Sequence, residues 1–146
     1  MLDTGVFLLS FTQEEGGDKV RNIIERHEAG DLELFIHPNN LVEAYKVINI
    51  IEKEKPGLIR NRIPPEEVIR SAYATLSVIQ DERTTLNLGI LRTKYHNKPW
   101  GDLSAAAVAM SLSDGLEDTN VPVLILEHEK HFGDINEITA WRLSQL

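Results

Sequence analysis

The stretch GDLSAAAVAMSL, residues 101–112, places a single acid, Asp102, at the head of a run of small apolar residues. Such a run predicts a helix that belongs to the protein core. Asp102 then has two interpretations. It caps the helix by accepting hydrogen bonds from free backbone N–H groups, or it belongs to an acidic cluster that binds a metal ion. The remaining acids of the chain have to distinguish these two roles.

The segments before and after this stretch alternate between strands and helices. Helices are predicted over 18–30, 39–55, 66–79 and 84–100, and strands at residues 1–3, 32–37 and 121–126. Asn39 or Asn40 is expected to cap the second helix. Alternating strands and helices predict a parallel sheet with helices on both faces. We therefore expect an α/β fold, a three-layer α/β/α sandwich around a short parallel sheet, in one domain over 1–146.

Composition limits the functions that the chain can have. Its 146 residues are 42% hydrophobic, enough for one domain with a sizeable core. The absence of cysteine excludes disulfides and thiolate chemistry. No apolar run approaches the roughly 20 residues that span a bilayer, and an acid with no basic flank makes the first residues a poor signal peptide. We expect a cytoplasmic protein without a membrane segment.

Acids fall where a parallel sheet exposes its ligand-binding edge, at the carboxyl ends of the strands. Asp3 ends the first predicted strand, and Glu127 and Glu129 follow the last one. Asp102 opens the helix that leads into that strand, and Glu43 lies in the first turns of the helix after the second strand. Taken singly, each has an ordinary role as a cap, an exposed helix acid or a loop acid. Carboxylates that meet at one edge would instead repel one another unless a cation bound them.

Four segments, in this order, resemble the motifs of the PIN-domain family, which includes the VapC-like toxin ribonucleases. LDTGVFLL contains Asp3 and the hydroxyl of Thr4, and NNLVEAYKVI contains Glu43. The strongest match is LGILRTKYHNKPWGDLSAAAVAMSL, in which Asp102 is the acid, and VPVLILEHEKHFGDI resembles the final strand and its acidic loop. The resemblance covers nearly the whole chain and implies a PIN-like fold.

The resemblance also implies an activity, a Mg²⁺- or Mn²⁺-dependent endoribonuclease that hydrolyses phosphodiester bonds of single-stranded RNA. Such enzymes leave a 5′ phosphate and a 3′ hydroxyl. A homodimer and a small antitoxin protein, as in type II toxin–antitoxin pairs, are implied as partners. The implied metal ligands and catalytic residues are Asp3, Glu43, Asp102 and Glu129, with Thr4 and Glu127 in supporting positions around them.

The last motif departs from the family pattern. Glu129 stands where the family usually has aspartate, Glu127 flanks it, and His131 stands where another acid is common. Spacing to Phe132 favours Glu129 as the residue that faces the site, and Glu127 stays an alternative. These departures support a second hypothesis, a PIN-fold module that binds RNA or a protein with weak or no hydrolysis. HEKH, residues 128–131, also permits a transition-metal site.

Two basic segments, IRNRIPP (59–65) and LRTKYHNKPW (91–100), are candidates for contact with an RNA backbone, although solvated helix ends have the same composition. Tyr95 or Trp100 is a candidate for stacking a base. Basic side chains beside an acidic metal site would help to capture a polyanion despite the net charge of −8. The candidate cations are Arg60, Arg62, Arg92, Lys94 and Lys98.

Overall fold

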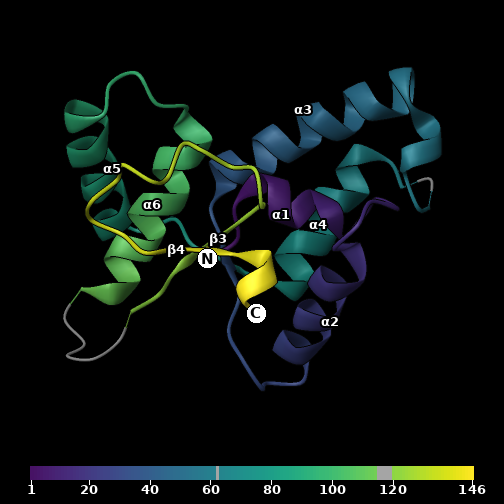
Figure 1. Cartoon of the computed structure of the whole chain (residues 1–146), viewed down its shortest axis with the longest axis horizontal. Coiled ribbons are helices and arrows are strands. Elements are labelled where there is room, and N and C mark those ends of the chain that lie inside the picture. The colour runs from purple at the N-terminus through teal and green to yellow at the C-terminus, as the bar shows by residue number, and fades with distance from the viewer. Residues whose placement is uncertain (62, 115–119) are drawn as a thin grey trace.

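A computed structural model describes residues 1–61, 63–114 and 120–146 (Figure 1). Within these ranges the chain is mixed α/β and mostly helical, with short parallel strands. The elements in chain order are α1 (Thr4–Leu9), α2 (Gly17–Glu28), β1 (Phe35–Ile36), α3 (Pro38–Glu54), a 3₁₀ turn (Pro56–Leu58), α4 (Pro65–Thr75), β2 (Ser77–Val78), α5 (Glu82–Lys94), α6 (Trp100–Ser113), β3 (Val123–Ile125), β4 (Ala140–Arg142) and a second 3₁₀ turn (Leu143–Gln145).

The strands form two parallel pairs, joined by the first residues of the chain. β1 pairs with β2, and β3 pairs with β4. Between the pairs, the backbone N–H of Leu2 donates to the carbonyl of Phe35 (2.8 Å) and that of Asp3 donates to the carbonyl of Leu124 (3.2 Å). The α/β class and the parallel pairing expected from the sequence are thus confirmed. The first strand is as short as predicted, a single bridge at Leu2.

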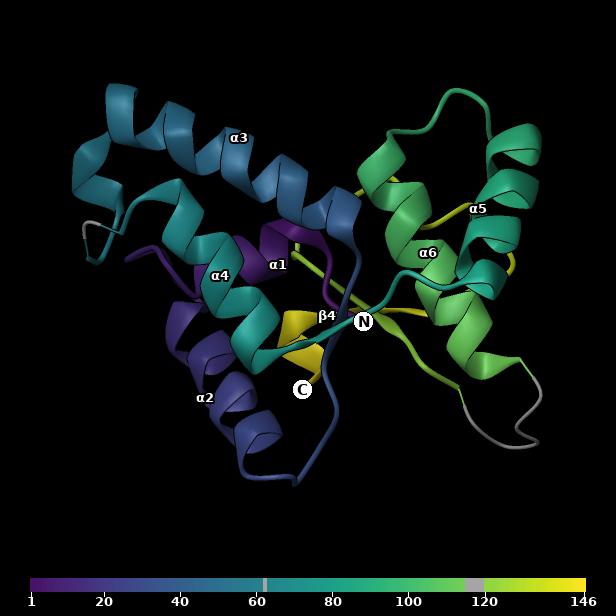
Figure 2. The ribbon, with the colours of Figure 1, turned by 180° about the vertical axis from the view of Figure 1, so that it is seen from behind.

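The helices lie on two sides of these strands (Figures 1 and 2). α5 and α6 form one group, and α1, α2 and α4 form the other, with α3 running from one group to the other. α6 is buried over nearly its whole length, since every residue from Gly101 to Ala109 is buried. Its small side chains allow α5 to pack closely, and Asn87 Nδ2 of α5 donates to Ser111 Oγ of α6 at 2.8 Å. The opening stretch is core helix, as predicted.

Several element boundaries differ from the prediction. The helix expected over 66–79 ends at Thr75, because the amides of Ser77 and Ile79 donate to the carbonyls of Leu34 and Ile36 and extend this segment into β2. The helix predicted over 84–100 ends at Lys94, and α1 and β4 were not predicted.

The predicted cap of α3 was also wrong. His37 is the N-cap, and its Nδ1 accepts from the amide of Asn39 at 3.0 Å. Pro38 follows at the first helical position, where its fixed φ and missing N–H are tolerated. Asn40 therefore does not cap α3, and its side chain contacts Thr4 and Gly101.

The helices in the described ranges are too short or too polar to cross a membrane.

Candidate metal centre

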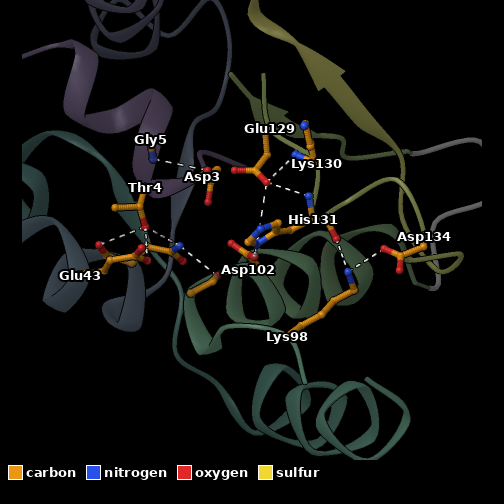
Figure 3. Close-up of polar contacts among 12 residues, drawn as sticks. Asp3, Thr4, Gly5, Glu43, Lys98, Asp102, Glu129, Lys130, His131 and Asp134 are labelled. Carbon is orange, nitrogen blue, oxygen red and sulfur yellow. Dashed lines mark hydrogen bonds and ion pairs between the residues drawn. The ribbon is translucent and has the colours of Figure 1, made fainter. Parts of the chain in front are cut away.

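Side chains from four separate segments gather at one edge of the strands (Figure 3). Asp3 is the N-cap of α1, directly after the bridge at Leu2, and Asp102 lies in the first turn of α6. Glu43 projects from the second turn of α3, and Glu129 lies in the loop after β3. The structure therefore brings toward one another the acids that the sequence placed at this edge.

Asp3 is the most deeply buried of these acids, with 5% of its surface exposed. Burial raises the pKa of its carboxyl to about 7, and the negative charges of Asp102 and Glu129 add to the rise. Hydrogen bonds from the backbone at Thr4 and Gly5 oppose the rise without cancelling it. A carboxylate held here at neutral pH is therefore destabilised unless positive charge reaches it.

Replacing Asp3 by asparagine should make the folded protein more stable at neutral pH. The pKa of Asp3 is raised from 3.8 to about 7. Between these pH values the folded protein therefore keeps a proton on Asp3 that the unfolded chain has lost. The protonated Asp3 carboxyl is the form that suits the folded state, so this stability is fully present below about pH 4 and is lost as the pH rises through about 7. We expect Asp3→Asn to raise the free energy of unfolding by about 1–2 kcal/mol at pH 8, and the gain to shrink toward pH 4.

Urea unfolding in the presence of a chelator, repeated across this pH range, measures the effect. Asp18→Asn is the control, because Asp18 is an exposed acid whose pKa is lowered by its hydrogen bond to Arg21. A gain of the same size at every pH would contradict the burial of a destabilised carboxylate at Asp3.

Glu43 belongs to a hydrogen-bond network that links α1, α3 and α6. The hydroxyl of Thr4 donates to Glu43 Oε2 at 2.9 Å, and Asn40 Nδ2 donates to Thr4 Oγ1 at 3.0 Å and to the carbonyl of Gly101 at 3.1 Å. Glu43 is exposed as a residue, and this network holds its carboxylate beside Thr4, the chain neighbour of Asp3. Asn40 is fully buried, and its Oδ1 has no hydrogen-bond partner among the residues that the structure describes.

Gly101 makes room for the carboxylate of Glu43. A Cβ atom at position 101 would overlap Glu43 Oε2. We expect Gly101→Ala to push this carboxylate away from Thr4. Because the displaced atom ends a flexible side chain and alanine favours the helix, the free energy of unfolding should change by less than about 1 kcal/mol. Metal affinity and any metal-dependent hydrolysis should fall about 10- to 100-fold.

Gly89→Ala is the matched control for Gly101→Ala. Gly89 lies within α5, and a Cβ atom there would meet no atom of the described residues within 4 Å beyond its own helix backbone and chain neighbours. It should raise the free energy of unfolding by roughly 0.5–1 kcal/mol and leave metal binding unchanged. Equal metal affinity in the Gly101→Ala and Gly89→Ala proteins would show that the position of Glu43 does not matter.

Asp102 does not cap α6. The N-cap is Pro99, and Asp102 has its side chain directed at the loop after β3, where His131 Nδ1 lies 2.7 Å from Asp102 Oδ2. Burial raises the pKa of Asp102, and Glu129 and Glu43 add to the rise against the lowering effect of His131. The hydrogen bond to Asp102 raises the pKa of His131. The helix-cap interpretation of the opening stretch is therefore wrong, and Asp102 belongs to the acidic cluster.

The loop after β3 presents Glu129, and not Glu127, to the cluster. Glu129 Oε1 accepts from the backbone N–H groups of Lys130 and His131, both at 2.7 Å. The Glu127 carboxylate accepts instead from the amide (2.8 Å) and the hydroxyl (3.0 Å) of Ser144. Arg142 donates to the carbonyls of Leu126, Glu127 and Glu129 and so holds the turn that separates the two glutamates.

The basic candidates are dispersed. Lys94 pairs with Glu137, and Lys98 pairs with Asp134 at 2.6 Å on the side of the cluster where His131 lies. Arg60 lies near Asp18 of α2, and its charge contributes to the lowered pKa of that acid. Arg92 lies against the ring of Trp100. Arg62 is outside the residues that the structure describes.

The donor set suits a hard divalent cation, because carboxylate oxygens are the ligands that Mg²⁺ and Mn²⁺ prefer. The raised pKa of Asp3 is a further fit, because a cation would relieve the repulsion from Asp102 and Glu129. In the described ranges, however, no three His, Asp or Glu side chains are grouped closely enough to enclose a metal ion. A shared ion would therefore require these acids to come closer together than they lie here.

Two residues of this site were not assigned to it from the sequence. The sequence predicts Asn39 or Asn40 as the cap of α3, and only the contacts of Asn40 with Thr4 and Gly101 place it in the network. For His131 the sequence indicates a departure from an acidic motif and a possible transition-metal ligand in HEKH, but not a contact with Asp102. A signal for Asn40 existed in the paired asparagines after Pro38, since one helix start needs only one cap.

No family model matches this chain, and no curated protein is similar to it at the level of sequence.

Proposed function

We propose that this protein is a Mg²⁺- or Mn²⁺-dependent endoribonuclease that hydrolyses phosphodiester bonds of single-stranded RNA. The observation that carries the proposal is the buried carboxyl of Asp3, whose pKa is raised to about 7 beside Asp102 and Glu129. Its role as the N-cap of α1 does not require an ionisable side chain, and a buried ionisable group is costly at neutral pH. The resemblance to PIN domains supplies the chemistry that would use it.

We also propose the finer fold that this family implies, a three-layer α/β/α sandwich. The support is the row of parallel strands joined through Met1–Asp3, with helices on both sides. In this proposal the functional edge is the one where Asp3 and Asp102 meet, at the carboxyl ends of the strands.

Asp3, Glu43, Asp102 and Glu129 are the proposed metal ligands. A bound divalent ion would supply Lewis acidity that lowers the pKa of an attacking water and offsets the negative charge of the phosphodiester. The chain itself orients the ligands. Thr4 and Asn40 hold Glu43, and the backbone N–H groups at 130 and 131 hold Glu129. Such outer hydrogen bonds fix the direction of each carboxylate. Glu127 supports the loop through its bonds to Ser144.

Lys94 and Lys98 are the proposed contacts for the RNA backbone nearest the acids. Together with His131 they line an open groove of about 380 Å³ beside the cluster. Each of their ion pairs has one partner that is more than half exposed, Lys94 in the pair with Glu137 and Asp134 in the pair with Lys98, and ion pairs in contact with water are weak. A homodimer, a small antitoxin protein that covers the acids, and a cytoplasmic location are proposed on the family resemblance alone.

The pairing of His131 with Asp102 favours a second candidate function. Asp102 is a proposed metal ligand, and a protonated His131 already supplies it with a positive charge. In this alternative the protein is a PIN-fold module that binds RNA or a protein partner without cutting.

Incubation with a mixed single-stranded RNA pool tests the proposal. We expect wild-type protein to shorten the RNA with Mg²⁺ or Mn²⁺, leaving 5′ phosphates, and to do nothing in a chelator. Asp3→Asn should be inactive, although it folds stably. RNA that stays intact under every metal condition, while still binding the protein, would favour the module without hydrolysis. Cleavage that persists in the chelator would contradict the metal dependence.

A further inference from the structure

A second open groove, of about 640 Å³, shares Pro99 in its lining with the groove near His131. α3 and the start of α6 form its walls, and Glu43 of the acidic cluster is part of its lining. Two large apolar side chains also line it and are strongly exposed, Val42 at 70% and Trp100 at 52%. The groove thus combines an exposed aromatic ring with direct access to the cluster.

Trp100 is held in place although it is exposed. The guanidinium carbon of Arg92 lies 4.2 Å from the ring centroid, and Arg92 Nη1 donates to the carbonyl of Lys98 at 2.6 Å. The cation–π contact fixes the ring against a side chain that is itself anchored. An indole ordered in this way loses little conformational freedom when a flat partner stacks on it.

Tyr95, the other aromatic residue of this segment, is engaged in contacts within the protein. Its hydroxyl donates to Glu137 Oε2 at 2.8 Å and accepts from the amide of Asn136 at 3.2 Å. Its ring is partly buried and packs against the core formed by α5 and α6. Of the two aromatic candidates, Trp100 therefore has the accessible surface.

The charges around Trp100 match a polyanion better than an apolar peptide. Arg92 lies on the ring, and Lys46 lines the same groove. Among the residues that the structure describes, Lys46 has no carboxylate within ion-pair distance, unlike Lys94 and Lys98. A flat apolar platform flanked by cations is the combination that binds single-stranded nucleic acids.

We propose that this groove binds an unpaired nucleobase of single-stranded RNA, stacked on Trp100 and bordered by Val42, with the adjoining phosphate at Lys46. The nucleotide is the neighbour of the one at the acidic cluster, since Glu43 lines both. A base inside a duplex has both faces stacked on other bases, so the groove selects single strands. The identity of the nucleic acid as RNA rests on the proposed function; the stacking on Trp100 does not.

Tryptophan fluorescence tests the stacking directly. The chain has two tryptophans, Trp100 and Trp141, so Trp141→Phe leaves Trp100 as the only tryptophan reporter. A ten-nucleotide single-stranded RNA of mixed sequence is titrated at low ionic strength, once with a chelator and once with Ca²⁺. We expect saturable quenching in at least one condition. An abasic oligomer of the same length should not quench, and the matching RNA duplex should bind more weakly.

Binding of the same labelled RNA, followed by anisotropy, supplies the second measurement. Trp100→Ala should bind about 10- to 100-fold more weakly than wild type, and Trp100→Phe should recover part of the loss. Trp141→Ala is the matched control, since Trp141 is also exposed but lies on β4. Lys46→Ala should reduce the salt dependence of binding by about one phosphate contact.

Three results would overturn the inference. The first is absence of quenching in both conditions, and the second is equal RNA affinity of the Trp100→Ala and Trp141→Ala proteins. The third is a Trp100→Ala protein that loses as much affinity for duplex RNA as for single-stranded RNA. These outcomes separate from those for the proposed function. Quenching at Trp100 in a protein that never cuts RNA would refute the nuclease and keep the stacking site. RNA cleavage that is unaffected by Trp100→Ala would refute the stacking site and keep the nuclease.

Discussion

The proposed function predicts that Asp102→Asn eliminates the response to divalent metal ions and lowers RNA hydrolysis by at least about 100-fold. Loss of an outer hydrogen bond at a metal site costs about 10- to 100-fold, and loss of a direct ligand should cost no less. The substitution keeps the shape of the side chain but removes a negative charge that interacts with Asp3 and with Glu129. Metal affinity should fall because a cation is attracted by the combined charge of these carboxylates. Thermal unfolding with and without Mn²⁺ and an RNA cleavage assay measure the two effects.

The same substitution should not unfold the protein. Burial raises the pKa of Asp102, which means that its ionised form is unfavourable in the folded chain without a cation. The Tm of Asp102→Asn in a chelator should therefore equal or exceed that of wild type. Asp18→Asn, at an exposed acid of α2, is the control and should keep both the Mn²⁺ response and the activity. If wild type shows no Mn²⁺ response either, the metal-dependent enzyme is refuted.

Leu103→Ala should give the largest loss of stability, about 2–5 kcal/mol in the free energy of unfolding. Leu103 has no exposed surface and belongs to the core formed by α5, α6 and β3. It is a large side chain among the buried small residues 104–107. Close packing by backbone and small side chains leaves its neighbours little freedom to fill a cavity. Urea unfolding gives the value.

Leu86→Ala is the matched control for Leu103→Ala. Leu86 belongs to the neighbouring helix α5 but is 61% exposed. Its removal should change the free energy of unfolding by less than about 0.5 kcal/mol. Similar losses at both positions would mean that α6 is not the central helix of the core.

The sites of the acids were predictable, but their partners were not. Strand ends and helix starts can be recognised locally, and these place Asp3, Glu43 and Asp102 at one edge. Hydrogen bonds such as that of His131 to Asp102 join residues 29 positions apart in sequence. No local pattern encodes them. The same limit applies to Glu127 and Glu129, because the carboxylate of Glu127 is held by Ser144 and the carbonyl of Glu129 by Arg142, 17 and 13 positions further along the chain.

The sequence alone determined the elements that depend on neighbouring residues. The β-branched apolar run near Val123 predicts a buried strand, and the small residues after Asp102 predict a buried helix. Only the tertiary structure decided that Ser77 and Val78 leave a helical pattern to pair with β1, since that gain comes from hydrogen bonds to a distant strand. It also decided that Asp102 faces His131 instead of capping α6. Propensity acts within a few residues, whereas burial and charge act between segments that only folding brings together.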